Sequence, residues 1–200
     1  MSIQTPITIA EATRRITDRD YILPAIQREF VWDGEQIERL FDSLMRGYPI
    51  GALLFWSIKP ERLKDFQFYT FMEAYHERDH RHNEPIDLTG DTKTRIAVLD
   101  GQQRLTALYL GLKGTYADKI PYYRWSSEYA FPKRRLYIDL LAKPDYEADM
   151  AFKFKFLKEQ DVVQSDDVFW FPVGNILEFR ELADVFDLCV EKDLMSKELK

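Results

Sequence analysis

The chain has 200 residues, of which 46% are hydrophobic and 31% are charged, and its formal net charge is −6. This composition is typical of a soluble globular protein, and the length suffices for one large domain with its own core. The acidic balance makes the whole chain a poor electrostatic partner for DNA or an anionic membrane. Any contact with nucleic acid must therefore use a local patch or another domain.

Cysteine usage and hydropathy indicate a cytoplasmic protein without a membrane partner. The single cysteine, Cys189, excludes an internal disulfide and a multi-cysteine zinc site, and it fits a reducing compartment. No apolar run approaches the length of a membrane span, and the N-terminus lacks a signal-peptide pattern. Residues 191–200 are still helix-forming and charged. We therefore expect residues 1–200 to be a single domain at the N-terminal end of a longer protein.

Two capping boxes predict where the first two helices begin. Thr8 and Glu11 open a short helix, and Asp33 and Gln36 open a longer one that ends near a glycine and a proline. Between these helices, the apolar residues of 21–24 predict a strand that stops at its proline.

Residues 50–58 are nearly all apolar and predict a central buried strand. Gly51 within it indicates close approach by another backbone or a ligand. Residues 59–94 show little periodicity apart from a cluster of aromatic residues that favours a strand or hairpin. A charged run there contains three histidines, which we expect to lie in a solvated loop without a metal: His76, His80 and His82.

The clearest motif is a short strand, a polar turn and the start of a helix. Ile96–Leu99 is an apolar run that suits a strand buried on both faces, and Asp100-Gly101 is a turn signal. One face of the helix that follows is apolar, with the spacing i, i+3, i+4, i+7: Leu105, Leu108, Tyr109 and Leu112.

The C-terminal half predicts further strands and a last helix. Apolar and polar residues alternate over 136–140 and 152–156, and a third apolar strand covers 168–173. The last helix runs from about Asn175, with one apolar side formed by Ile176, Phe179, Ala183, Phe186 and Val190. Helices and strands alternate early and strands cluster late, so the sequence predicts an α+β fold with a mixed sheet.

Two polar groups are candidates for contact with a ligand. Arg104 falls in the first turn of its helix, where the free N–H groups and the helix dipole disfavour a cation unless an anion is also present. A phosphate is the usual anion at such a site, although Asp100 alone offers a structural partner. Gln27 and Arg28 form the second group, and Arg28 either meets a ligand or pairs with Glu29.

Three ordered blocks of sequence carry a resemblance: LPAIQREFVW, IERLFDSLMRGYPIGALLFW and VLDGQQRLTALY. They resemble the N-terminal domain family of GmrSD-type (type IV) restriction endonucleases over roughly residues 21–112. The resemblance implies a mixed sheet with packed helices like that of ParB and sulfiredoxin, in which the matching strand, turn and helix bind nucleotide phosphates. It also implies binding and hydrolysis of nucleoside triphosphates in modification-dependent DNA restriction, a form of phage defence. Cutting in such enzymes usually falls to an HNH nuclease domain.

The match extends to individual residues. Asp100, Gly101, Gln102, Gln103 and Arg104 match the family's DGQQR signature, and Gln27 and Arg28 match its first block. These residues are therefore the expected nucleotide site, in which Arg104 clamps phosphate oxygens and Arg28 is a second cation.

Each member of the signature has an expected part. The backbone N–H groups of Gly101–Gln103 would complete the anion cradle. Gln102 or Gln103 would orient a water or read a base, and Asp100 would hold Mg²⁺ or only fix the turn. Removing Arg104 should then weaken nucleotide binding and leave the stability of the unliganded chain unchanged. If Arg104 instead pairs with a buried carboxylate, its removal should cost stability.

Partners and rival functions follow from the same residues. The chain contains no P-loop, which excludes a Walker-type mechanism, and no His-Asn-His constellation, so an HNH domain is expected beyond residue 200 or on another chain. DNA is an expected partner through the full-length protein, and a homo-oligomer stays open. One rival is a binding-only module that uses nucleotide as an allosteric ligand.

The other rival is a DNA-recognition domain in which Arg104 and Gln103 contact DNA directly. Its best basic patch is Lys133-Arg134-Arg135, although the net charge argues against it. Lys153 and Lys155 interleave with aromatic residues, which indicates a solvated sheet edge or, as the alternative, a nucleic-acid face.

Overall fold

A computed structural model describes residues 5–26 and 28–194, so the predicted site residue Gln27 lies outside the described residues. The helices, with 3-10 helices labelled η, are α1 (Ile9–Thr17), α2 (Gly34–Met45), α3 (Pro60–Leu63), α4 (Gln102–Leu112), η1 (Glu128–Ala130), η2 (Glu159–Asp161), η3 (Val173–Glu178) and α5 (Leu182–Glu191). The predicted capping box at Asp33 and Gln36 is confirmed in full, and the one at Thr8 and Glu11 is confirmed in part. The Thr8 side chain accepts from the backbone N–H of Glu11, and Asp33 and Gln36 cap each other's backbone reciprocally.

The first sheet has five strands in the order β2-β6-β1-β3-β5. Its strands are β1 (Tyr21–Pro24), β2 (Leu54–Ile58), β3 (Phe68–Tyr69), β5 (Pro85–Ile86) and β6 (Arg95–Asp100). The centre is β6, which pairs in parallel with β1 and antiparallel with β2. The predicted α+β class and mixed sheet are thus confirmed, as is the buried strand before the DGQQR signature.

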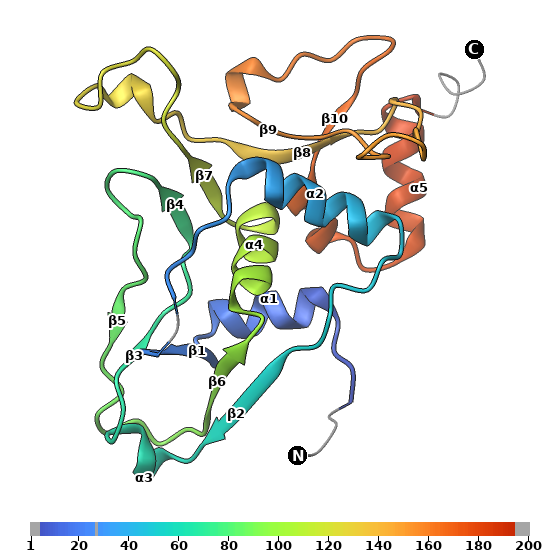
Figure 1. Ribbon diagram of the computed structural model, residues 1–200. Coiled ribbons are helices and arrows are strands. Elements are labelled where there is room, and N and C mark those ends of the chain that lie inside the picture. The colour runs from blue at the N-terminus through green and yellow to red at the C-terminus, as the bar shows by residue number, and fades with distance from the viewer. Residues whose placement is uncertain (1–4, 27, 195–200) are drawn as a thin grey trace.

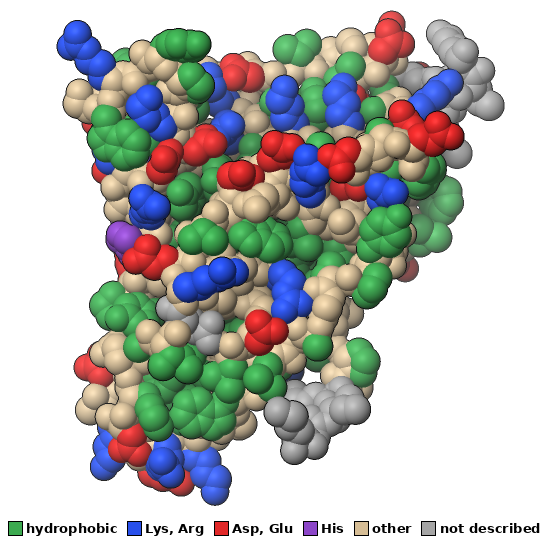
Figure 2. Space-filling view, viewed as in Figure 1, with side chains coloured by type: hydrophobic (Ala, Val, Ile, Leu, Met, Phe, Trp, Pro, Cys, Tyr) green, Lys and Arg blue, Asp and Glu red, His purple; other side chains and the backbone are tan. Residues whose placement is uncertain are grey.

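The prediction of a central strand over residues 50–58 is wrong. Only 54–58 form a strand, and β2 is the edge of the sheet, paired with β6 alone. Leu54 and Ser57 are exposed, because one side of an edge strand has no neighbour to cover it. Figure 2 shows hydrophobic side chains gathered on the surface in this region, near β2 and α3; Leu54 and Phe66 are among the exposed hydrophobic residues.

Helix α4 lies in the middle of the molecule, between α1, α2 and the five-stranded sheet (Figure 1). The sequence predicted a single apolar face, but every residue from Leu105 to Leu112 is buried. The reason is that other elements pack on several sides of α4: α1 and α2, the strands β7 (Thr115–Ala117) and β8 (Arg135–Asp139), and η3. Gly111 allows this packing, since a β-carbon there would lie within 2.6 Å of the Phe41 ring on α2.

A second sheet, in the order β10-β8-β9, packs against α2 on the side away from the five-stranded sheet (Figure 1). It adds β9 (Phe154–Leu157) and β10 (Trp170–Pro172) to β8. Phe154 and Phe156 face α2 while Lys153 and Lys155 are exposed, which confirms the predicted alternation.

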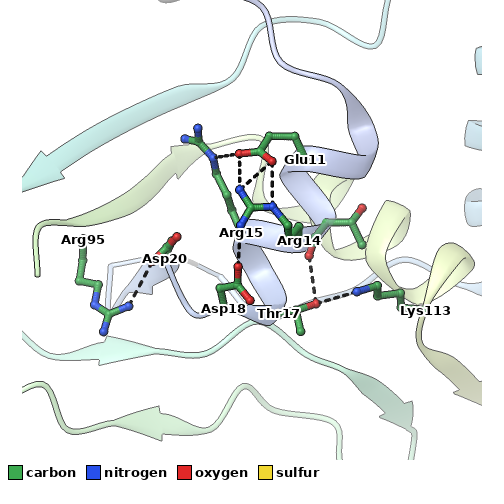
Figure 3. Close-up of polar contacts among 9 residues, drawn as sticks. Glu11, Arg14, Arg15, Thr17, Asp18, Asp20, Arg95 and Lys113 are labelled. Carbon is green, nitrogen blue, oxygen red and sulfur yellow. Dashed lines mark hydrogen bonds and ion pairs between the residues drawn. The ribbon is translucent and has the colours of Figure 1, made fainter. Parts of the chain in front are cut away.

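Two smaller features connect the layers. Strand β4 (Ala74–His76) pairs in parallel with β7 as a two-stranded sheet. Figure 3 shows the polar contacts around α1: Glu11 pairs with Arg14 and Arg15, and Lys113 donates to the Thr17 hydroxyl, which links α4 to α1. The ion pairs on α1 lie at the surface, partly exposed to solvent, and contribute little individually, whereas the Thr17 contact joins two core helices.

Two predictions about loops and the last helix need correction. The histidine region is structured, since His76 ends β4 and forms a bridge with His80. The last helix, α5, begins at Leu182 rather than near Asn175, and Phe186 and Val190 on its predicted apolar side are exposed. The 3-10 helix η3 occupies part of the interval, and the predicted apolar side is therefore not continuous. Within residues 5–26 and 28–194, no helix is long and apolar enough to cross a membrane.

Candidate functional site

The sequence DGQQR, residues 100–104, forms the junction between β6 and α4. Gly101 is the N-cap of α4 and adopts a left-handed conformation with φ of 90°. A side chain would be strained there, and a β-carbon would also lie 3.2 Å from Nη2 of Arg104. No side chain caps this end of the helix. The first N–H groups of α4 have no acceptor within the helix, as at any helix start, and a nearby anion would be favoured.

The two glutamines hold the chain segment that follows β1. Gln102 Nε2 donates to the carbonyl oxygen of Arg28 at 2.5 Å, and Gln103 Nε2 donates to that of Glu29 at 2.8 Å. Gln103 Oε1 also accepts from the backbone N–H of Val31 at 3.0 Å. Both glutamines are buried, so their amides replace water as partners for an irregular segment. Their amides therefore position residues 28–31 beside the start of α4.

Arg104 holds a different segment, the one that precedes β2. Nη1 donates to the carbonyl oxygen of Ile50 at 2.5 Å, and Nη2 donates to that of Ala52 at 2.9 Å. Nη2 also contacts Oδ2 of Asp100 at 3.3 Å. These three hydrogen bonds use three of the five N–H groups that a guanidinium carries. The close approach expected at Gly51 is that of the Arg104 side chain.

A pocket of about 240 Å³ opens beside Gln102. It lies between the end of β1 and the loop before β5, and its polar lining is Arg28, Glu29, Tyr69, His82, Asn83 and Gln102. Arg28 is exposed, and its side chain has no hydrogen bond or ion pair with any described residue. The structure thus gives no support for an Arg28–Glu29 pair. Glu29 instead pairs with His82, with 2.6 Å between Oε1 and Nδ1.

Asp100 lies outside this pocket lining, and its side chain is 71% exposed. Oδ2 of Asp100 lies 3.3 Å from Nη2 of Arg104, which is long for a hydrogen bond. Its carboxylate oxygens can therefore still bind other ligands. In the described part of the chain, no group of three or more His, Cys, Asp and Glu residues could hold a metal ion. A single carboxylate still suits Mg²⁺, which usually keeps several waters and shares phosphate oxygens with the protein.

The structure therefore brings some predicted site residues together and separates others. Arg28 and Gln102 line one pocket, whereas the Arg104 guanidinium lies against the segment before β2. Gly101 and Gln103 shape the junction without lining the pocket. Sequence reasoning missed Tyr69, His82 and Asn83 as pocket residues. The histidine was noticed only as a possible metal ligand, and nothing local in the sequence links residue 82 to residue 29.

Comparison with known proteins adds a family and a relative. Residues 9–197 match the family model described as the GmrSD restriction endonuclease, N-terminal domain. An uncharacterized protein of Methanocaldococcus jannaschii is 33% identical over 161 residues, which are 80% of this chain and 25% of that protein. The chain thus matches about a quarter of the length of this relative.

Proposed function

This chain belongs to the family of GmrSD restriction endonuclease N-terminal domains, and we propose that it binds and hydrolyses a nucleoside triphosphate to regulate a modification-dependent DNA restriction enzyme. The observation that carries the proposal is the pocket shared by Arg28 and the first residue of α4, Gln102. The pocket combines a cation that has no partner among the described residues with the start of an uncapped helix, and both favour a phosphate.

Arg28 and the helix start have complementary parts in the proposed site. The Arg28 guanidinium would bind phosphate oxygens as a two-pronged donor, because none of its N–H groups is committed to a described residue. The free backbone N–H groups at the start of α4, where Gln102 lines the pocket, would supply further donors. Gln102 holds the backbone of Arg28 and Gln103 holds that of Glu29, so the two amides keep the segment that carries the cation beside the start of α4.

Arg104 would contribute less to phosphate binding than the sequence predicted. Its contacts to Ile50 and Ala52 make it a positioning residue that fixes the turn at Asp100-Gly101, with at most two N–H groups left for a phosphate. Asp100 would hold Mg²⁺ together with the nucleotide, and the ion would neutralise charge on the phosphate oxygens. Gln102 and Gln103, whose amides hold the backbone, would act on an attacking water only by changing partners.

A titration with nucleotides tests the proposal. The 200-residue chain is titrated with ATP, GTP, CTP and UTP, with Mg²⁺, and phosphate release is followed in parallel. At least one nucleotide should bind, raise the melting temperature and be hydrolysed. Binding without phosphate release would favour the allosteric, binding-only module. No binding by any of the four would contradict the proposed function.

Arg28→Ala tests the pocket itself. It should weaken nucleotide binding by about tenfold or more, since a charge-assisted hydrogen bond contributes about 1.5–3 kcal/mol. The unliganded melting temperature should not change, because the side chain has no described partner to lose. Lys59→Ala is the matched control, an exposed cation just after β2. Equal affinities for the two variants would show that the pocket is not the nucleotide site.

A further inference from the structure

A second cavity lies far from the DGQQR junction, between the loop that joins β7 to β8 and the segment around η2. Its volume is about 870 Å³, within the range of ligand-binding pockets. In Figure 1 this is the upper edge of the molecule, where the loop containing η1 lies near the end of β9. The residues that matter for its chemistry are Tyr123, Tyr129, Tyr137, Lys133, Arg135 and Lys158.

Two of the aromatic side chains that line this cavity are open to solvent, whereas Phe131 and Tyr137 are buried. Tyr129 is 83% exposed and Tyr123 is 49% exposed. Among the described residues neither ring packs against another ring, unlike Phe131, which lies at 5.2 Å from Trp125 and 5.0 Å from His76 between ring centroids. Large exposed aromatic rings in one groove are unusual for a surface that contacts only water.

The loop that presents these rings is held at several points. The backbone N–H of Ile120 donates to the carbonyl of Ala130 at 2.7 Å, and Tyr116 and Arg134 form a β-bridge. Phe131 is buried and anchors the C-terminal part of the loop. The tyrosines are therefore displayed by a supported loop, which lowers the entropy lost when a ligand orders them.

Cations outnumber acids by three to two in the lining of the cavity, although the chain as a whole is acidic. Lys133 and Arg135 are exposed and have no ion-pair partner among the described residues, while Lys158 pairs with Asp161. The exposed Lys155 lies opposite Tyr137 in the β8–β9 register and extends the row of cations along the sheet. Two acids, Glu128 and Glu159, also line the cavity. Residues 119–135, however, contain five cationic residues and only one acidic residue. Figure 2 shows Lys and Arg side chains beside hydrophobic ones at this upper edge.

We propose that this cavity, the tyrosine groove, binds single-stranded nucleic acid, with bases stacked on Tyr123 and Tyr129 and phosphates near Lys133 and Arg135. Exposed rings beside cations that have no ion-pair partner among the described residues are the combination that proteins use to bind single strands. A duplex fits less well, because its bases are already stacked on one another and present only their edges. The proposal does not depend on the nucleotide pocket, which lies on other elements.

The test uses a fluorescently labelled 15-mer of dT and a duplex of the same length, titrated with the 200-residue chain by anisotropy at several salt concentrations. The single strand should bind more tightly than the duplex, with an affinity that falls as salt rises. The double variant Tyr123→Ala/Tyr129→Ala should bind the single strand at least tenfold more weakly. Tyr146→Ala is the matched control, since Tyr146 is exposed on a different loop.

Charge variants separate the two parts of the groove. Lys133→Glu/Arg135→Glu should weaken binding and flatten its salt dependence, whereas Lys64→Glu, an exposed lysine near α3, should change neither. Melting temperatures confirm that each variant is folded.

Three results would overturn the proposal. The first is no binding of the 15-mer by the folded chain, and the second is equal binding by the tyrosine double variant and by Tyr146→Ala. The third is a concentration-dependent rise in mass that the tyrosine double variant abolishes. That result would assign the groove to a second copy of the chain instead.

Discussion

A β-carbon placed on Gly51 would lie 2.6 Å from Nη1 of Arg104. Gly51 also has a φ of +84°, so two independent constraints exclude a side chain at this position. Its neighbours Ile50 and Ala52 supply the carbonyl oxygens that accept from the same guanidinium. The segment before β2 is thus shaped around Arg104, and this relationship leads to two predictions.

Gly51→Ala should destabilise the chain by about 2–4 kcal/mol, through backbone strain and displacement of Arg104. Gly90→Ala is the matched control, because Gly90 has a φ of +82° and a β-carbon there would have no atom within 4 Å. Strain alone should cost Gly90→Ala about 1–2 kcal/mol. Urea unfolding of both variants measures the difference. Equal losses of stability would show that displacing Arg104 adds nothing to the cost of backbone strain.

Arg104→Ala should destabilise the unliganded chain by about 1.5–3 kcal/mol, since it removes hydrogen bonds from a charged donor to two carbonyls. The sequence alone led us to expect no such loss, and the contacts to Ile50 and Ala52 reverse that expectation. Arg104→Lys should recover only part of the loss, because an ammonium lacks the planar fork. Denaturant unfolding measures the stability of both variants. If the stability losses of Gly51→Ala and Arg104→Ala simply add in the double variant, the two residues do not interact energetically.

Gln103→Ala should release residues 29–31 from α4. Gln103 is buried and makes two hydrogen bonds to this segment, so its truncation should cost about 1–3 kcal/mol. Hydrogen exchange at the Val31 amide should accelerate more than exchange in β6. Gln36→Ala serves as a control that removes a hydrogen bond from the exposed cap of α2. Unchanged protection of the Val31 amide would contradict the conclusion that Gln103 holds this segment against α4.

Glu38→Gln should change how stability depends on pH. Burial raises the pKa of the Glu38 carboxyl, although the backbone N–H of Phe156 donates to it and opposes the shift. A raised folded pKa means that the native state holds the proton more tightly, so this group's contribution to stability falls as pH rises above about 4.5. Glu38→Gln keeps an acceptor for Phe156 and removes the charge.

The measurement for Glu38 is chemical unfolding of both proteins between pH 4 and pH 8. The stability of the variant relative to the original chain should increase with pH through the acidic range and then level off. Glu61→Gln, which removes an exposed carboxylate on α3, is the control. A difference between the variant and the original that stays constant with pH would contradict the raised pKa.

Local signals in the sequence predicted much of the fold. Capping boxes gave the starts of α1 and α2, and the apolar run at Ile96–Leu99 gave β6, because these features depend on residues within a few positions of one another. The position of a strand within the sheet was harder to predict. Residues 54–58 are as apolar as a central strand, yet β2 is an edge, since the choice of neighbours depends on residues far along the chain.

The sequence predicted only part of the lining of the candidate pocket, and it predicted the arrangement of the residues less well. The family resemblance indicated Asp100–Arg104 and Arg28, and Arg28 and Gln102 do share a pocket. The direction of the Arg104 side chain was not predictable, because its acceptors are carbonyl groups about 50 residues away that carry no side-chain signature. For the same reason nothing in the sequence pointed to His82 opposite Glu29. The likeness to ParB and sulfiredoxin stays a prediction.

The parallel pairing of β1 with β6 also determines when the protein can fold during synthesis. Tyr21 pairs with Ile96, so the first strand emerges from the ribosome about 75 residues before its central neighbour. At about 5–20 residues per second, roughly 4 to 15 seconds pass before the sheet can close. The second sheet, whose strands span residues 135–172, follows later still. The nascent chain therefore exposes Tyr21–Leu23, later buried, for seconds, an interval in which chaperones can bind it.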